Sequence, residues 1–198
     1  FPNLKRLDKE NAIEKFEKLM AYVTGISSFL LLGYFPINLI VRTFLTEYNE
    51  SIYYLRIILP GFVVTCCINM IIFTYYKILN HINIFVCISM GMLTLGLVLN
   101  CAGYFWIAPK PEVFSVLSIL ILICWYLVSE LYLVKRYHIG WKKNCIYMLM
   151  LINVFYCVVE VLEDSIIFAG GIYLILYILI TALFYGKSFL RVWKAGKV

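Results

Sequence analysis

The chain has 198 residues, of which 64% are hydrophobic and only 14% are charged. Soluble domains average about 45–50% apolar and about 25% charged residues, so this composition excludes an ordinary soluble domain and predicts an integral membrane protein. The formal net charge is +6, but the basic residues lie beside apolar runs, which predicts attraction to membrane lipids with anionic headgroups and no nucleic-acid partner.

The first segment, residues 1–20, carries charges of both signs, and Ile13, Phe16 and Met20 share one helical face. This pattern predicts a cytoplasmic amphipathic lead-in helix on the membrane surface, and a solvated helix without lipid contact would show the same pattern. The chain opens on Phe1 within a charged stretch. We therefore expect no signal peptide and a fragment of a longer protein.

Residues 21–106 predict three membrane-crossing helices, because about 20 apolar residues cross a bilayer core. These spans run from about 21 to 45, from 57 to 80 and from 84 to 106. Pro36 predicts a kink in the first span. The acidic, tyrosine-rich residues 46–56 predict a loop. The turn at 80–83 is so short that the second and third spans should be antiparallel neighbours.

Residues 107–186 predict three further transmembrane helices, and residues 187–198 predict a basic cytoplasmic tail. The three spans run from about 113 to 134, from 144 to 162 and from 165 to 186. Pro109 and Pro111 predict the break before the fourth span. With six spans and short loops, the chain has no room for a soluble domain.

The distribution of basic residues predicts the orientation. Fourteen of the 17 lysines and arginines lie in one set of alternating segments, and Arg42, Arg56 and Lys110 lie in the other. The basic set consists of residues 1–20, 77–83, 135–143 and 187–198. Because cytoplasmic loops carry an excess of lysine and arginine, both ends of this chain are predicted to be cytoplasmic.

Cysteine and tyrosine are frequent, and neither pattern indicates a catalytic or metal site. The seven cysteines lie in or beside apolar runs, without a CxxC pair or a cluster with histidine. We therefore expect small apolar fillers, with no metal and no cofactor. The 16 tyrosines are typical of the aromatic belts at membrane interfaces.

Four passages carry a resemblance to a known family. They are PNLKRL at 2–7, AIEKFEKLM at 12–20, YLRIILPG at 54–61 and TYYKILN at 74–80. In this order they resemble the later half of bacterial polysaccharide flippases of the O-antigen and capsule type, within the multidrug, oligosaccharidyl-lipid and polysaccharide exporter superfamily. The resemblance covers residues 1–106. Beyond it the chain reads APKPEVFSVLS, where the family often has Gly-x-x-Gly-Ala-Ala.

The resemblance implies the second-lobe part of a two-lobed exporter in the bacterial cytoplasmic membrane. Such an exporter moves a polyprenyl-diphosphate-linked oligosaccharide between leaflets by alternating access. The lipid-linked oligosaccharide, a coupling cation and a missing amino-terminal lobe of the same chain are the implied partners. No bond is broken, so we expect a transporter and not an enzyme, and we expect this lobe to be inactive alone.

Polar residues inside the spans are the candidates for substrate binding. Arg42 would pair with the diphosphate or an acidic sugar, and snorkelling to the interface is the alternative. Asn69 would line the cavity and bond sugar hydroxyls, and hydrogen bonds between helices are the alternative. Asn100 is a further candidate for substrate binding, for which hydrogen bonds between helices are expected. Lys77 would receive a phosphate at the cytoplasmic mouth, and a topology anchor is the alternative.

Other polar residues favour structural roles. Asn153 is expected to hold helices together. Glu130 is expected to form a local ion pair with Lys135 or Arg136, which follow it by just over one helical turn. Glu160 is expected in a solvated acidic rim, with a coupling-ion role as the alternative.

Two other functions remain open. A membrane-embedded glycan polymerase or acyltransferase needs a catalytic base or an arginine-rich set at a membrane-facing loop, and the short predicted periplasmic loops count against it. A drug or cation antiporter of the same superfamily would favour a carboxylate deep in the membrane. Glu130 and Glu160 both lie near span ends in the sequence, which counts against that function.

Overall fold

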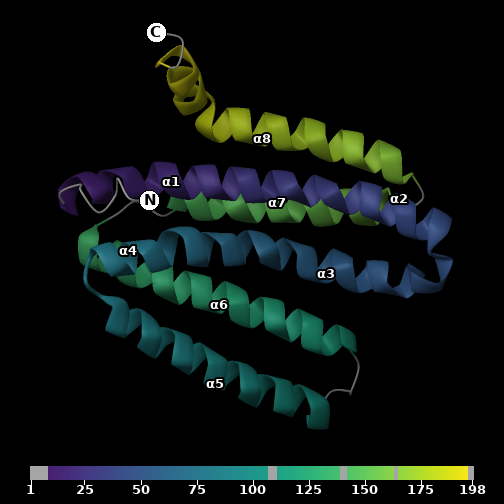
Figure 1. The fold of residues 1–198 in the computed structure, drawn as a ribbon, viewed down its shortest axis with the longest axis horizontal. Coiled ribbons are helices and arrows are strands. Elements are labelled where there is room, and N and C mark those ends of the chain that lie inside the picture. The colour runs from purple at the N-terminus through teal and green to yellow at the C-terminus, as the bar shows by residue number, and fades with distance from the viewer. Residues whose placement is uncertain (1–8, 107–110, 139–141, 163–164, 196–198) are drawn as a thin grey trace.

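The computed structural model describes residues 9–106, 111–138, 142–162 and 165–195 (Figure 1). All regular elements within these ranges are helical. Among them, six helical stretches are long and apolar enough to cross a membrane. The prediction of an all-α, multi-pass membrane protein with about six spans is therefore confirmed.

The six spans are built from eight α-helices and three short irregular helical segments. In chain order these are α1 (Lys9–Phe29), the 3₁₀ turn η2 (Leu30–Gly33), α2 (Tyr34–Phe44), the 3₁₀ turn η3 (Thr46–Tyr48), α3 (Asn49–Cys66), the π-helix η4 (Cys67–Ile72), α4 (Phe73–Ile78), α5 (Ile82–Trp106), α6 (Pro111–Tyr137), α7 (Lys142–Val161) and α8 (Ile166–Ala195). The first span combines α1, η2 and α2, and the second combines η3, α3, η4 and α4.

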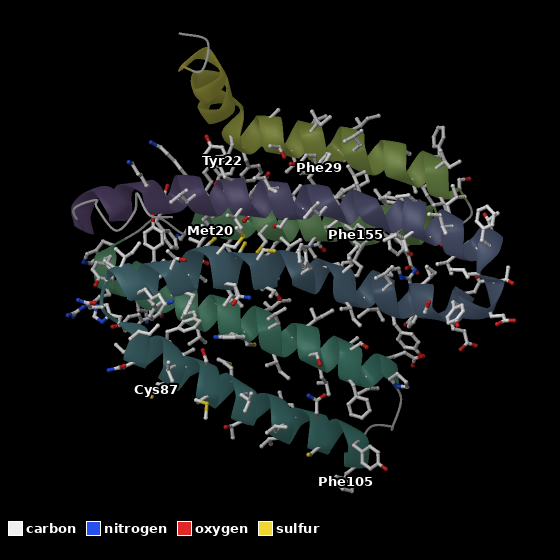
Figure 2. The ribbon with its side chains drawn as sticks, viewed as in Figure 1. Met20, Tyr22, Phe29, Cys87, Phe105 and Phe155 are labelled. Carbon is white, nitrogen blue, oxygen red and sulfur yellow. The ribbon has the colours of Figure 1, made fainter. Side chains whose placement is uncertain are left out.

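The helices lie roughly side by side, with α5 at one edge and α8 at the other (Figure 1). The α1–α2 span, α7 and α3 form the middle, and α6 lies between α3 and α5. Figure 2 shows the contrast between the interior and the edge. Phe155 points into the packed middle and is fully buried, whereas Phe105 on α5 is 78% exposed.

The irregular turn in the first span lies on the amino-terminal side of Pro36. Proline has no N–H to donate to the carbonyl four positions earlier. That carbonyl belongs to Leu32, inside the 3₁₀ turn η2. The predicted irregularity is present as a tightened turn that ends before the proline.

The loop predicted at residues 46–56 is helical from Asn49 onward. No glycine or proline occurs between 46 and 59, so nothing in the local sequence breaks a helix. Ile52 is buried against the neighbouring helices, and this packing stabilises the first turns of α3. The second span therefore begins about two turns earlier than the apolar run suggests.

The apolar face predicted for residues 1–20 packs against protein. Phe16 and Met20 are fully buried, and the Phe16 ring meets the Tyr75 ring edge-on at 4.8 Å. α1 continues without a break from Lys9 into the first span, while residues 1–8 lie outside the described part. At the other end, α8 continues past residue 186 to Ala195.

Several tyrosines lie in the core, so the prediction of interfacial belts is wrong for them. The fully buried ones are Tyr75, Tyr76, Tyr126, Tyr147 and Tyr173. Two hydroxyls of α8, on Tyr173 and Tyr177, donate to the carbonyls of Ser28 and Gly25 on α1 at 2.8 and 3.0 Å. A buried phenol needs such a partner, and the bond fixes one helix on the next.

Candidate functional site

A polar pocket lies at one end of the layer, where α2, α3, α7 and α8 meet. We call it the arginine pocket. Its polar lining consists of Tyr34, Asn38, Arg42, Asn49, Tyr53 and Arg56. Its volume is about 90 Å³, enough for a few waters or one small charged group. Pockets for whole ligands measure about 300–1,000 Å³, so only part of a large substrate would fit.

Two guanidinium groups reach this pocket from different helices. Arg42 comes from α2 and is exposed at the rim, and Arg56 comes from α3. Arg56 Nη1 lies 3.1 Å from Glu160 Oε2, and its guanidinium lies 5.2 Å from the centre of the Tyr53 ring. The Arg56 side chain is 17% exposed and that of Glu160 is 71% exposed. Glu160 therefore lies at a solvated rim, as predicted, and water screens the ion pair it forms there.

Asn38 adds a hydrogen-bond acceptor to the same pocket. Its side chain is buried, and Nδ2 donates to the Tyr34 hydroxyl at 3.2 Å. Its Oδ1 has no hydrogen-bond donor among the described residues. A buried acceptor without a partner costs about 1–3 kcal/mol, so a donor from water or a ligand is expected here. The pocket thus offers cationic donors and one open acceptor.

Helix α3 also borders an apolar groove. Leu55, Leu59 and Phe62 line an open groove of about 590 Å³ between α3 and α6. Thr65, Ser115 and Ser118 add the few polar side chains. Arg56 follows Leu55 directly in sequence, so one turn of α3 presents a cation to the arginine pocket and apolar side chains to the groove.

The four predicted substrate-binding residues do not form one site. Arg42 lies in the arginine pocket. Asn69 is exposed on η4. Lys77 lies on α4, towards the opposite end of the layer (Figure 1), with Nζ 4.3 Å from the centre of the Phe73 ring. Asn100 borders a separate groove between α5 and α6.

The predicted interhelical bonds of Asn100 and Asn153 are wrong. Asn100 Nδ2 donates to the Gly96 carbonyl at 2.9 Å, and Asn153 Nδ2 donates to the Leu149 carbonyl at 2.9 Å. Both bonds connect positions four apart on the same helix. An amide at this spacing reaches its own backbone at little entropic cost, so it needs no partner helix.

Sequence reasoning missed Asn38 and Arg56 as pocket residues. Asn38 precedes Arg42 by four positions, and this spacing places both on one helix face, so a signal for Asn38 was present. Arg56 was assigned to the end of a loop. Its place in the pocket depends on the earlier start of α3, which the sequence pattern did not indicate.

A second polar feature lies deeper in the fold. Glu130 on α6 is fully buried, and neither carboxylate oxygen has a hydrogen-bond partner among the described residues. Lys135 and Arg136 are exposed. Residues five and six positions apart do not share a helix face, so the predicted local ion pair is absent.

Comparisons with protein-family models, curated proteins and solved structures find no match for this chain. Within the described residues, no three histidine, cysteine, aspartate or glutamate side chains are grouped so that they could hold a metal ion. The seven cysteines are free. The arginine pocket, the α3–α6 groove and the resemblance in residues 1–106 are therefore the features that bear on function.

Proposed function

We propose that this protein takes part in moving a polyprenyl-diphosphate-linked oligosaccharide across a bacterial cytoplasmic membrane, for export of a cell-surface polysaccharide. The observation that carries the proposal is that α3 borders both a polar pocket and an apolar groove. Arg56 faces a polar pocket, while Leu55 and Leu59 face an apolar groove. An amphiphilic cargo with an anionic head and a prenyl chain needs both environments close together.

The arginine pocket suits the anionic and hydroxylated part of the cargo. Arginine donates paired hydrogen bonds to phosphate or carboxylate oxygens, and Asn38 Oδ1 would accept from a sugar hydroxyl. Because the pocket holds only about 90 Å³, it would take the diphosphate or a single acidic group, with the glycan outside. No step of this function breaks a bond in the cargo.

Transport by the full-length protein in vesicles tests the proposal. A lipid-linked oligosaccharide with a fluorescent sugar would be placed in the inner leaflet, and a glycosidase outside would report its arrival in the outer leaflet. Arg42→Ala combined with Arg56→Ala should slow transport about tenfold or more, because hydrogen bonds to charged groups contribute about 1.5–3 kcal/mol. Arg136→Ala removes an exposed arginine of α6 and is the matched control.

Two results would contradict the proposal. Absence of transport by the folded wild-type protein would exclude the flippase function in this form. Equal rates for the double variant and for Arg136→Ala would exclude the arginine pocket as the cargo site. A third result, transport by residues 1–198 alone, would agree with the flippase function and would show that the expected second lobe is not required.

A further inference from the structure

Glu130 is buried in a way that needs an explanation beyond packing. Its side chain is 0% exposed and lies inside the fourth span. A carboxylate taken out of water without a partner loses several kcal/mol of solvation. Ionisable groups in this position are rare in membrane proteins and usually serve function. The arginine pocket does not include Glu130.

The groups that face Glu130 come from three helical elements, and none carries a positive charge. Tyr126, one turn earlier on α6, interacts with the carboxyl, although neither oxygen accepts a hydrogen bond of ordinary geometry. Cys67 of η4 and Cys145 of α7 are its other electrostatic neighbours. Among the described residues, no charged group of α3 or α5 contributes to its environment. Within the described residues, these surroundings supply no cation that would pair with a carboxylate.

The same position is a junction of the fold. Cys67 Sγ lies 3.3 Å from the Thr24 hydroxyl of α1, so α1 contacts the element that neighbours the carboxyl. Next to it on α6, the Ser129 carbonyl accepts a hydrogen bond of 2.9 Å from Tyr76 on α4. A change of charge at Glu130 would therefore act where α6 packs on η4, which in turn contacts α1.

The helix that faces Glu130 is irregular at this level. Cys67 begins the π-helix η4, Cys67–Ile72, which separates α3 from α4. Pro60 lies two turns earlier in α3. Single π-turns inside α-helices are common at functional sites, and proline and π-turns are recognised causes of helix bending. The second span can therefore bend beside the buried carboxyl.

We propose that Glu130 is a proton-binding site, which holds its proton while η4 is packed on α6 and releases it when the second span bends away at η4. On release, the O–H bond of the acid breaks, the proton passes to entering water, and water solvates the carboxylate. Rebinding of a proton restores the neutral acid and the closed packing. Each form thus stabilises one arrangement of the helices.

The link between this exchange and cargo movement rests on the proposed function, whereas the exchange itself does not. If both hold, one proton moves in each cycle of oligosaccharide transport. Within the described residues, no three histidine, cysteine, aspartate or glutamate side chains are grouped at Glu130, so the several acidic ligands that a divalent cation prefers are absent there.

Infrared spectroscopy of the full-length protein in vesicles tests the site directly. The wild type should show the C=O stretch of a protonated carboxylic acid at neutral pH, and Glu130→Gln should lose it. Glu160→Gln is the matched control and should keep it, because Glu160 is exposed and paired with Arg56. An unchanged band in Glu130→Gln would overturn the proposal, as would absence of the band in the wild type.

Cysteine labelling is a second measurement. It includes the wild type, so it still tests the proposal if Glu130→Gln folds poorly. Cys145 is buried and interacts electrostatically with Glu130, and Cys157 lies exposed on the same helix. The ratio of Cys145 to Cys157 alkylation should rise with pH in the wild type, since each pH unit above the midpoint increases the deprotonated fraction relative to the protonated one about tenfold. In Glu130→Gln the ratio should rise less with pH, since only the different ionisation of the two thiols remains. An equal rise in the wild type and in Glu130→Gln would contradict opening on deprotonation.

A pH-sensitive dye inside the vesicles separates the two proposals. Acidification or alkalinisation that accompanies cargo transport in the wild type and disappears in Glu130→Gln supports the coupling. Cargo transport without proton movement contradicts it. If no cargo moves, the proposed function fails, and the infrared band still decides whether Glu130 binds a proton.

Discussion

The two edge helices, α5 and α8, are equally exposed but are attached in different ways. In each, 11% of the most apolar stretch is buried, against 50% for α7. α8 is hydrogen-bonded to α1 through Tyr173 and Tyr177. α5 approaches α6 through glycines, with Gly103 against Leu117 and Gly96 against Ile121.

The difference shows what can hold a helix against its neighbours in lipid, where the hydrophobic effect contributes little to helix association. Helices in lipid associate through close packing and hydrogen bonds. The side-chain bonds found on α5, from Ser89, Thr94 and Asn100, return to its own backbone. Within the described residues, close packing therefore positions α5 along its length, whereas directional bonds also set the register of α8.

The largest effect is expected from Tyr173→Ala. The change removes a fully buried ring that packs against Phe35 and Phe155, and it removes the bond to Ser28. Truncation of a buried aromatic residue costs about 3–5 kcal/mol. Thermal unfolding in detergent measures the loss. Tyr104→Ala on α5, where the ring is 54% exposed, should change stability little, and equal losses at both sites would refute the contrast.

An intermediate effect is expected at the glycine contact of α5. A Cβ atom at Gly103 would lie 2.8 Å from Leu117 Cδ1, whereas one at Gly91 would meet nothing within 4 Å. Gly103→Ala should therefore be less stable than Gly91→Ala by about 1 kcal/mol, the low end of the cost of overpacking, because Cδ1 is the end of a flexible side chain. Both changes add the same helix propensity, so the difference in thermal unfolding isolates the contact. Equal stability would mean that Leu117 moves aside without cost.

The smallest effect is expected from Tyr177→Phe. This change removes only the hydroxyl that donates to the Gly25 carbonyl at 3.0 Å. Interhelical hydrogen bonds in membranes contribute about 0.6 kcal/mol on average. Thermal unfolding should show a loss of that size, and Tyr104→Phe should show none. A Tyr177→Phe variant as stable as the wild type would mean that this bond contributes nothing to the attachment of α8.

The sequence by itself determined the class of the protein and the number of spans. Composition and the length of the apolar runs suffice for this. In a bilayer, each backbone N–H and C=O group needs a hydrogen-bond partner within the protein, and an α-helix provides these partners within one apolar run. The proline effect before Pro36 and the tight turn before α5 also followed from local chemistry. The start of α3 did not, because helix breakers and packing decide it, and hydropathy does not.

Only the tertiary structure decided which polar residues act together. Arg42 and Arg56 enter one pocket from two helices, while Asn69, Lys77 and Asn100 lie apart from it. Composition cannot distinguish an interfacial tyrosine from Tyr173, whose hydroxyl bonds a neighbouring helix. It likewise cannot show that Glu130 is fully buried. Burial depends on which faces meet, and segments far apart in the chain set those contacts.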